Sequence, residues 1–391
     1  MVTSSAQLTG WAHTRFGKLD APDVQTLMAE VARPAIADAG LEPKDIDAIV
    51  VGVYNNGFSA QAFEASLVGA RLPELAAVPA VHAENACATG SAALFTALEK
   101  VESGRARAVL VIGAEKMTAT PNERVNEILL SACHRATEEV AGSFAGVFAK
   151  LADLYAERYG DPREAMAQIA AKNHRNGVAN PYAHMRKDLG FEFCATESAK
   201  NPVVAGRLLR TDCSMVSDGA AAVIVADADL ARSARRAVAV RGRAQVNDHL
   251  ALAARSDPLE LAGAGAAFAA ALADAGVGLA SISLLETHDC FTIAELLQYE
   301  AFGIAEPGKA AGVLAAGATA RGGQLPVNVS GGLKSKGHPL GATGVSQHVM
   351  AAMQLVGEAG DMQLPTVDLA AVFNMGGAAV ANYASVLERT R

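Results

Sequence analysis

Short apolar runs alternate along the chain with longer stretches in which apolar residues recur about once per helical turn. This pattern predicts a helix over residues 23–39 followed by a buried strand over 46–53. It predicts a second helix over 91–101 followed by a buried strand over 108–113. Such alternation is typical of proteins built around parallel strands, and we therefore expect an α/β fold.

The same order of elements returns in the second part of the chain. The letters Ala-Asp-Ala-Gly close a predicted helix at 37–40 and again at 273–276, each time before a predicted strand. Later, the stretches 80–82 and 326–330 each lead into a glycine-containing turn and a helix. Four letters in an alanine-rich chain can match by chance, but the repeated order around them favours a duplicated fold.

A segment of different character interrupts the first half. We predict an N-terminal half over residues 1–245 and a C-terminal half over 246–391, with an insertion over about 118–209 that is richer in polar and ionisable residues. Within the insertion, residues 172–182 have no clean periodicity and contain Asn, Gly and Pro, which predicts an ordered loop. Loops held on a rigid scaffold often carry binding sites.

The composition excludes several classes of protein. Hydrophobic residues make up 51% of the 391 residues, but no run of about 18 uncharged apolar residues occurs, so we expect no membrane-spanning helix. The first residues lack the basic and apolar segments of a signal peptide. A formal net charge of −8 argues against a general nucleic-acid binder. Five cysteines, an odd number without an export signal, predict reduced thiols and a cytoplasmic location.

Cys87 is the first candidate for chemistry. It lies in the stretch Glu-Asn-Ala-Cys-Ala-Thr-Gly-Ser over 84–91, immediately before an alanine-rich predicted helix. Unpaired backbone N–H groups and the positive end of the helix dipole stabilise a thiolate at such a position, so we expect a lowered pKa and a nucleophilic role. The alternative is a small buried core residue without a chemical role.

His338 is the best candidate for a partner of this thiol. It lies in a glycine-rich stretch over 331–344, and the glycines around it indicate a tight backbone path. A histidine held in such a turn can act as general base towards a thiol. Two alternatives remain open, namely a phosphate-binding loop, although the residue order of a P-loop is absent, and a purely structural turn.

A third polar group, His288-Asp289-Cys290-Phe291, follows a predicted strand over 284–287. The carboxyl ends of parallel strands are where α/β proteins place their sites. The alternative is a helix cap by Asp289 with a buried Cys290. The chain has no Cys-x-x-Cys or His-x-x-x-His spacing, so we expect no zinc or other metal site.

The remaining candidates are a glycine pair and three further thiols. Gly376 and Gly377 follow a predicted strand, and their backbone N–H groups are suited to holding an oxyanion, although most such turns are structural. Cys213 leads into a predicted core strand and is expected to be inert. The sequence leaves the roles of Cys133 and Cys194 undecided.

Taken together, these segments resemble the motifs of the thiolase family over essentially the whole chain. The resemblance rests on the helix start at Cys87, Ser-Asp-Gly-Ala-Ala at 217–221, Gly-His-Pro-Leu-Gly-Ala-Thr-Gly at 337–344 and Gly-Gly-Ala at 376–378. It implies a five-layered αβαβα fold made of two similar halves. It also implies that the inserted loop domain covers a coenzyme A site.

Two departures from the common motifs point to one branch of the family. Most thiolases have Asn-Glu-Ala-Phe where this chain has His-Asp-Cys-Phe at 288–291, and they have a second catalytic cysteine where this chain has Asn374. Both differences are similar to the sterol-carrier-protein type of thiolase, in which the second thiol comes from the His-Asp-Cys-Phe motif. A thiol lost at one position and gained at the other favours an active enzyme.

The resemblance implies an acyl-CoA C-acyltransferase in lipid metabolism. In thiolysis, Cys87 attacks the keto carbon of a 3-ketoacyl-CoA after His338 takes its proton, and the reverse reaction is a Claisen condensation. Cys290 transfers the proton of the enolate carbon, and His288 contributes to an oxyanion hole. Backbone N–H groups of Cys87 and Gly376 stabilise the oxyanion on the acyl group.

Coenzyme A enters this reaction as a substrate, and the resemblance implies no further cofactor. The residues expected to contact coenzyme A are Arg175, Arg186, Ser330 and Gly331. Because relatives are dimers or tetramers, we expect a homodimer or homotetramer, with no nucleic-acid or membrane partner.

Two other functions remain open. One is a thiolase-fold aldolase, a lyase that cleaves a 3-hydroxyacyl-CoA without an acyl-cysteine and with the help of an accessory protein. The other is a non-catalytic subunit that binds acyl-CoA. The presence of Cys87, His288, Cys290 and His338 argues against both, since neither function needs all four.

Overall fold

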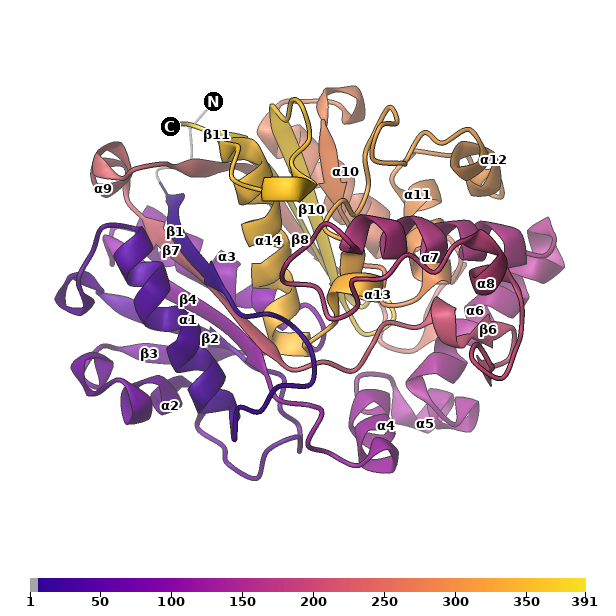
Figure 1. The fold of residues 1–391 in the computed structure, drawn as a ribbon, viewed down its shortest axis with the longest axis horizontal. Helices are drawn as coiled ribbons and strands as arrows, with labels where there is room; N and C mark the ends of the chain where they lie inside the picture. Colours follow the sequence, from indigo (N-terminus) through magenta and orange to yellow (C-terminus); the bar gives the residue numbers. More distant parts are fainter. Residues whose placement is uncertain (1–5) are drawn as a thin grey trace.

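The strands of both halves form one mixed sheet in the computed structural model, which describes residues 6–391 (Figure 1). Within this range its nine strands lie in the order β3-β2-β4-β7-β1-β8-β11-β10-β9. Their bounds are β1 (Gln7–His13), β2 (Ala48–Gly52), β3 (Ala80–Ala83), β4 (Ala108–Glu115), β7 (Gly219–Ala226), β8 (Val238–Asn247), β9 (Leu284–Glu286), β10 (Leu369–Gly376) and β11 (Ala381–Arg389). A separate small sheet pairs β5 (Val203–Ala205) with β6 (Leu208–Leu209).

The sheet consists of two halves with the same topology. In the first half β2 pairs in parallel with β3 and β4, and β7 and β1 follow in antiparallel pairing. In the second half β9 pairs in parallel with β10 and with the single residue Val327, and β11 and β8 follow in antiparallel pairing. Two residue pairs join β1 to β8. The predicted duplication is therefore confirmed, while the predicted division after residue 245 falls inside β8.

The repeated Ala-Asp-Ala-Gly stretch has the same structural role in both halves. Asp38 accepts a hydrogen bond from the backbone of β1, and Asp274 accepts one from the backbone of β8, both at 2.9 Å. Both strands have glycine where the helix backbone crosses them. A Cβ at Gly10 would lie 2.4 Å from a backbone nitrogen at the end of the first helix, and a Cβ at Gly242 would lie 2.3 Å from one at the end of its counterpart. The repeat is thus one helix–strand contact made twice.

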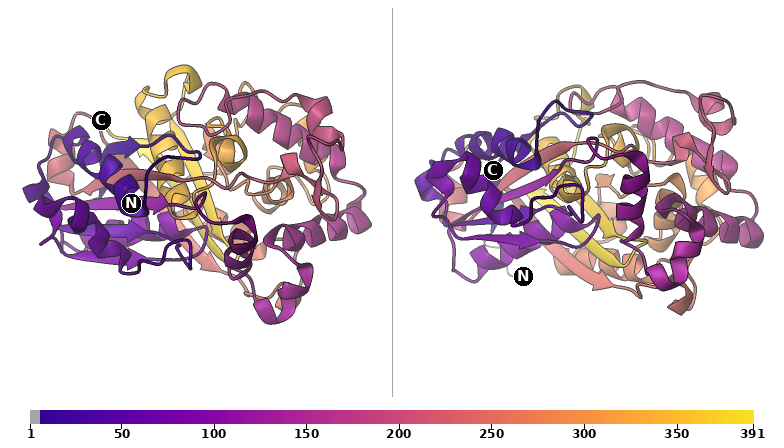
Figure 2. Two further views of the ribbon diagram at one scale, coloured as in Figure 1. Left: turned by 60° about the horizontal axis from the view of Figure 1, so that its bottom comes forward. Right: turned by 90° about the horizontal axis from the view of Figure 1, so that it is seen from below.

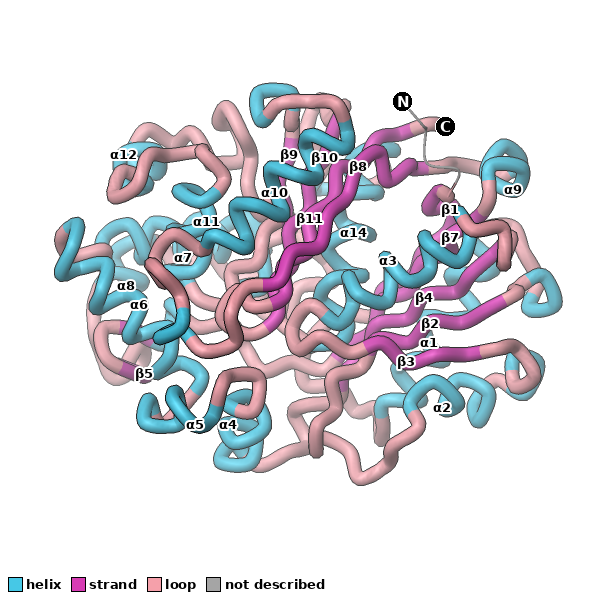
Figure 3. Tube along the Cα trace, turned by 180° about the vertical axis from the view of Figure 1, so that it is seen from behind, coloured by secondary structure: helices cyan, strands magenta, loops and turns pink. Residues whose placement is uncertain are grey.

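Helices on both faces of each half-sheet complete five layers, as Figures 1 and 3 show. Helices α1 and α2 cover the outer face of the first half, and α10, with α11 beside it, covers the outer face of the second. Helices α3 and α14 pack against each other between the two halves. The bounds of these helices are α1 (Val24–Asp38), α2 (Glu64–Arg71), α3 (Thr89–Glu102), α10 (Ala262–Ala275), α11 (Thr292–Ala301) and α14 (Leu340–Val356). The expected αβαβα arrangement is confirmed.

The insertion between β4 and β7 is mainly helical. It lies on the side of the molecule away from α1 and α2 (Figures 1 and 2). Its helices are α4 (Asn122–Leu130), α5 (Arg135–Glu138), α6 (Phe144–Tyr159), α7 (Arg163–Gly177) and α8 (Phe191–Ala195), and the remaining helices of the chain are α9 (Ala228–Ser233), α12 (Ala310–Ala315) and α13 (Gly332–Lys336). Over residues 6–391, no helix combines the length and the apolar character that crossing a bilayer requires.

The prediction of a loop over 172–182 is wrong for its first part, because α7 extends well into this stretch. Three polar side chains in this part of α7, those of Lys172, Asn173 and Asn176, are turned towards the C-terminal half. Lys172 Nζ lies 2.6 Å from a carboxylate oxygen of Glu295, and Asn176 donates a hydrogen bond to the carbonyl of Asn328 at 3.0 Å. A helix that buries a polar face has no amphipathic pattern, because residues remote in sequence supply the partners.

Candidate active site

The residues singled out as catalytic from the sequence lie together in the interior. Cys87 precedes α3, His288 and Cys290 follow β9, His338 precedes α14, and Gly376 ends β10. All of them are buried. Because α3 and α14 pack against each other between the half-sheets, the segments before the two helices meet although they are about 250 residues apart.

Three of these side chains form a compact group. The sulfur of Cys87 and one ring nitrogen each of His288 and His338 all lie within 4.8 Å of one another. The two imidazole rings meet edge to face, with centroids 5.0 Å apart. A cavity of about 260 Å³ opens beside the group; Cys87, Cys290 and His338 line it, together with apolar side chains such as Leu129. This separation suits a nucleophile with two imidazole partners, and it also suits a set of metal ligands.

The contacts of His338 fix which ring nitrogen carries its proton. Its Nδ1 lies 2.7 Å from the hydroxyl oxygen of Thr343, and that hydroxyl donates its hydrogen to the carbonyl of Pro339. The hydroxyl must therefore accept from Nδ1–H, which leaves the lone pair on Nε2. That Nε2 is buried and has no hydrogen-bond partner among the described residues. Burial, assisted by the Lys336 cation, lowers the pKa of His338 to about 3, so the ring is a neutral base.

The lowered pKa expected for Cys87 at a helix start is wrong. Burial raises the pKa of this thiol to about 12. Backbone N–H groups, first that of Gly377, stabilise the thiolate, but this effect is smaller than the loss of solvation. At neutral pH Cys87 is therefore a thiol, and it becomes a nucleophile only when a base removes its proton.

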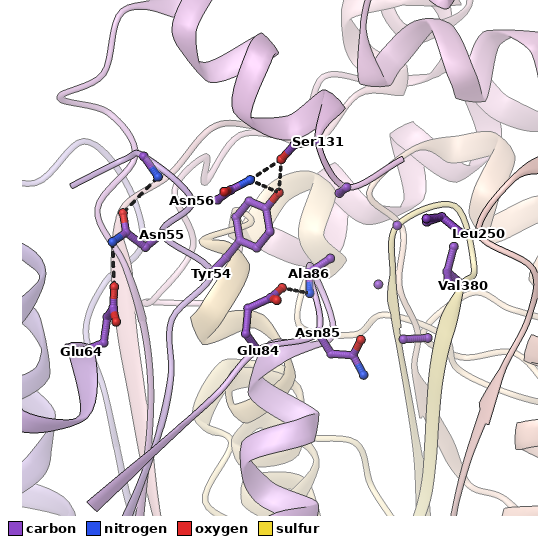
Figure 4. A pocket seen from close by; sticks show the side chains of 15 residues that line it. Tyr54, Asn55, Asn56, Glu64, Glu84, Asn85, Ala86, Ser131, Leu250 and Val380 are labelled. Carbon is purple, nitrogen blue, oxygen red and sulfur yellow. Dashed lines mark hydrogen bonds between the residues drawn. The ribbon is translucent and has the colours of Figure 1, made fainter. Parts of the chain in front are cut away.

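The glycine pair after β10 approaches the backbone next to Cys87. A Cβ at Gly376 would lie 2.3 Å from the carbonyl oxygen of Asn85, so only glycine fits there. A larger cavity, of about 600 Å³, is lined by both glycines and by Ala86 (Figure 4). Polar side chains such as Tyr54 and apolar ones such as Leu250 and Val380 complete its walls, and none of the three side chains of the compact group lines it. The smaller cavity is therefore the candidate site, because Cys87 lines it and does not line the larger one.

Cys290 reaches the same cavity from the opposite half of the chain. Burial, and secondly the neighbouring Cys87, raise the pKa of Cys290 well above its usual value, so it is a thiol that can donate a proton. The carbonyl of Cys290 accepts the N–H of Ser214 at 2.9 Å. The next side chain, Phe291, stacks on Phe148 with ring centroids 4.4 Å apart. The hydrogen bond at Cys290 and the ring contact at Phe291 together restrict the position of the thiol.

Asp289 joins two of the candidate catalytic segments. Its carboxylate accepts the backbone N–H groups of Leu333 and Lys334 at 2.6 and 3.1 Å, at the start of α13. It also accepts from the side chain of Asn173 on α7 at 2.7 Å. Asp289 is indeed a helix cap, but of a helix remote in sequence. It thereby links the segment of His288 to the segment that ends at His338.

We expect the substitution Asp289→Ala to lower the free energy of unfolding by about 3 kcal/mol or more, because three buried donors lose their acceptor. The measurement is urea-induced unfolding followed by circular dichroism. The matched control is Asp188→Ala, which removes an exposed carboxylate paired with Arg175 and should cost at most about 1 kcal/mol. Equal costs for the two variants would contradict the role assigned to Asp289.

The structure does not bring the residues predicted to contact coenzyme A to the cavity. Arg175 and Arg186 are exposed and bond to groups within the insertion. Ser330 is buried, and its hydroxyl donates to the carboxylate of Glu286 at 2.5 Å. Gly331 begins α13 and packs against the backbone of α7.

Two residues to which the sequence assigns no role, Cys213 and Asn374, lie at the site. Cys213, expected to be an inert core residue, lines the cavity with Cys87 and Cys290. The buried Lys334 donates a hydrogen bond to the carbonyl of Cys213 and so supports this wall. Asn374, noted only as the replacement of a family cysteine, contacts both Cys87 and His288. No local spacing distinguishes these residues, since each acquires its place through elements far along the chain.

Two family models match the chain. The model described as "Thiolase, N-terminal domain" matches residues 8–229. The model described as "Thiolase C-terminal domain-like" matches residues 244–389. Together they cover both halves of the duplicated fold.

Known proteins similar in sequence include enzymes and lipid-carrier proteins. The acetyl-CoA acetyltransferase of Methanothermobacter thermautotrophicus is 35% identical over 370 residues, which cover 94% of this chain and 95% of that protein. Sterol carrier protein 2 of Rattus norvegicus is 32% identical over 401 residues, which cover 95% of this chain and 70% of that protein.

Solved structures share the fold. The Ltp2-ChsH2(DUF35) aldolase superposes with a TM-score of 0.82 at 22% identity, covering 100% of this chain and 99% of that chain. Human mitochondrial 3-ketoacyl-CoA thiolase in complex with CoA superposes with a TM-score of 0.74 at 18% identity, covering 99% and 98%. With both family models and relatives above 30% identity along nearly the whole chain, the resemblance in the motifs is confirmed: the chain belongs to the thiolase family.

Proposed function

We propose that the protein is an acyl-CoA C-acyltransferase, which carries out thiolysis of a 3-ketoacyl-CoA or the reverse Claisen condensation through an acyl group on Cys87. The observation that carries the proposal is the meeting of Cys87, the basic Nε2 of His338 and the thiol of Cys290 at one apolar cavity. The acetyl-CoA acetyltransferases among the relatives support the same class of reaction.

The first half of thiolysis acylates the enzyme. Nε2 of His338 takes the proton of Cys87 while the sulfur attacks the keto carbon of the substrate. The carbon–carbon bond between the keto carbon and the α-carbon then breaks. Its electron pair leaves with the shorter acyl-CoA as an enolate, and the acyl group stays on Cys87 as a thioester. The thiol of Cys290 protonates the enolate carbon.

The second half returns the enzyme to its starting state. The thiolate of Cys290 takes the proton of incoming coenzyme A, whose sulfur attacks the acyl-thioester. Cys87 leaves as a thiolate and regains its proton from His338. Every proton transfer is thus between groups at the same cavity, whose lining is largely apolar. Coenzyme A is a substrate in this scheme, and no further cofactor is required.

The apolar cavity favours an acyl thioester as the substrate. Met117, Leu129 and Phe144 supply apolar surface for an acyl chain, and Ser214 and Met215 also line the cavity. Arg175 and Arg186 lie in the insertion at exposed positions, where they remain candidates only for the charged end of coenzyme A outside the cavity.

The edge of the sheet supports a homodimer or a homotetramer. β3 is the terminal strand in the described chain, and Val81 on it is 41% exposed. An open edge strand with apolar side chains is suited to pairing with a second copy. Light scattering coupled to gel filtration distinguishes the proposed assemblies from a monomer.

The acyl-enzyme is the direct test of the proposed function. The protein is incubated with acetyl-CoA or acetoacetyl-CoA, quenched in acid, and examined by intact mass and peptide mapping. We expect one acetyl group on the peptide that contains Cys87, and its disappearance when coenzyme A is added. Absence of an adduct with every acyl-CoA tried would refute the proposal.

The same experiment distinguishes the proposed acyltransferase from an aldolase and from a non-catalytic subunit. An aldolase acting on a 3-hydroxyacyl-CoA would release an aldehyde or ketone and would leave Cys87 unmodified. A non-catalytic subunit would bind acyl-CoA without adduct or turnover. The three functions therefore predict three different product sets from one series of incubations.

The rate should be insensitive to pH in the weakly acidic range. Because the pKa of His338 is lowered to about 3, its Nε2 stays unprotonated well below neutrality. We expect kcat/KM for thiolysis to change by less than about twofold between about pH 6 and pH 5, whereas a base of ordinary pKa near 6.5 would lose about eightfold. The check is a pH–rate profile, with circular dichroism at each pH to confirm that the fold persists. A decline with an inflexion near 6.5 would contradict the assignment of a buried, neutral base.

A further inference from the structure

One neighbour, Asn374 on β10, determines which ring nitrogen of His288 carries the proton. Nδ1 of His288 lies 2.9 Å from Nδ2 of Asn374, and Nε2 of His288 is buried with no hydrogen-bond partner in residues 6–391. Burial lowers the pKa of His288 well below its usual value, so the ring is neutral and carries a single N–H. The question is which of the two nitrogens holds it.

The orientation of the Asn374 amide follows from its other contacts. One of its N–H groups donates to the main-chain carbonyl of Cys87 at 3.1 Å. A carbonyl only accepts, so the nitrogen of the amide, not the oxygen, must be on that side. The amide oxygen in turn accepts the hydroxyl of Ser91 at 2.8 Å. The amide is thus held from both ends, and its second N–H points at Nδ1 of His288.

We propose that Asn374 is a positioning residue that fixes His288 with its proton on Nε2, making His288 a hydrogen-bond donor towards the reacting atoms beside Cys87. Nδ1 accepts from the amide and therefore carries no proton. The remaining N–H is Nε2–H, which has no partner in the described chain and is free to bind an oxyanion. The inference deepens the proposed function, and its use in catalysis rests on that function.

The two imidazoles then have opposite roles. Thr343 leaves Nε2 of His338 as an acceptor, whereas Asn374 leaves Nε2 of His288 as a donor. One ring can take the proton of Cys87 while the other stabilises negative charge on a substrate oxygen. The same reasoning argues against a metal at these three side chains, because a protonated nitrogen has no lone pair to coordinate one.

The tautomer is measured directly by ¹⁵N NMR of protein labelled at histidine, without substrate. Signals of His288 are identified from their loss in His288→Gln. In the wild-type protein we expect Nδ1 to resonate as an unprotonated nitrogen and Nε2 as a protonated one. In Asn374→Asp the carboxylate accepts from the ring, and we expect Nδ1 to become protonated. The control Ser91→Ala should keep the wild-type tautomer, since the carbonyl of Cys87 still orients the amide.

Activity provides a second measurement. Loss of one oxyanion donor costs about 10²–10³-fold in kcat, so Asn374→Asp should lower kcat by that factor with a smaller change in KM. A wild-type Nδ1 that is already protonated would overturn the inference, even if Asn374→Asp did not fold. The inference would also be overturned if Nδ1 had the same ¹⁵N chemical shift in the wild type and in Asn374→Asp. Failure of the proposed function would instead appear as a missing acyl-enzyme, with the tautomer unaffected.

Discussion

Replacement of Cys87 by alanine should abolish acylation and reduce thiolysis by at least about 10⁴-fold. The acyl group needs a thiol that lies beside a base. The cavity's two other thiols, Cys290 and Cys213, do not belong to the compact group that contains both histidines. The measurements are the intact mass after incubation with acetyl-CoA and the steady-state rate with acetoacetyl-CoA and coenzyme A. Unfolding in urea should remain close to that of the wild type, because the side chain removed is small.

The matched control for this variant is Cys133→Ala. Cys133 is also a buried thiol of the same half, but it does not line the cavity. This control should keep both the acyl adduct and the turnover. An adduct that persists in Cys87→Ala, or one that is lost in Cys133→Ala, would show that the nucleophile has been assigned to the wrong cysteine.

Replacement of Cys290 by alanine should separate the two halves of the reaction. Cys87 and His338 remain, so acylation by acetyl-CoA in a single-turnover experiment should persist. Protonation of the enolate carbon loses its donor, and steady-state thiolysis should fall by about 10²–10⁴-fold. A second readout is the exchange of deuterium from solvent into the methyl group of acetyl-CoA, which should disappear in this variant.

Cys213→Ala is the control for Cys290→Ala, because both thiols line the same cavity and only one has a proposed role. We expect Cys213→Ala to retain deuterium exchange and most of the turnover. If Cys290→Ala turned over at the wild-type rate, proton transfer would have to be assigned to another group. Comparison of the two variants therefore tests whether Cys290 transfers the proton, and not merely whether a thiol is present in the cavity.

The candidate catalytic side chains can be found from the sequence because each lies beside a local signal. Cys87 precedes an apolar helix, His338 lies among glycines, and His288 and Cys290 directly follow a buried strand. Such signals depend on neighbours within a few residues, and the structure places these residues in contact or at one cavity. The helix start, a local feature, predicts a lowered pKa for Cys87. The burial that instead raises this pKa comes from segments remote in the sequence.

The supporting residues were not accessible in the same way. The position of Asp289 in the sequence suggests a cap for the helix that follows it, but it caps α13, more than 40 residues away. Asn374 contacts His288 across 86 residues. The charge of Arg175 and Arg186 suggests a contact with coenzyme A, but the structure places both on the surface of the insertion. Charge and residue type alone do not determine which side chains meet.

Local patterns are enough to predict several strands and helices, the duplication, and the thiols and imidazoles of the candidate site. These follow from periodicity and from short motifs, which need only a few neighbouring residues. Long-range packing, in contrast, buries the polar face of α7, places Cys87 at its cavity, and sets which nitrogen of each histidine carries a proton. Each of these depends on desolvation and on hydrogen-bond partners contributed by distant segments, and such partners become neighbours only once the two halves have packed together.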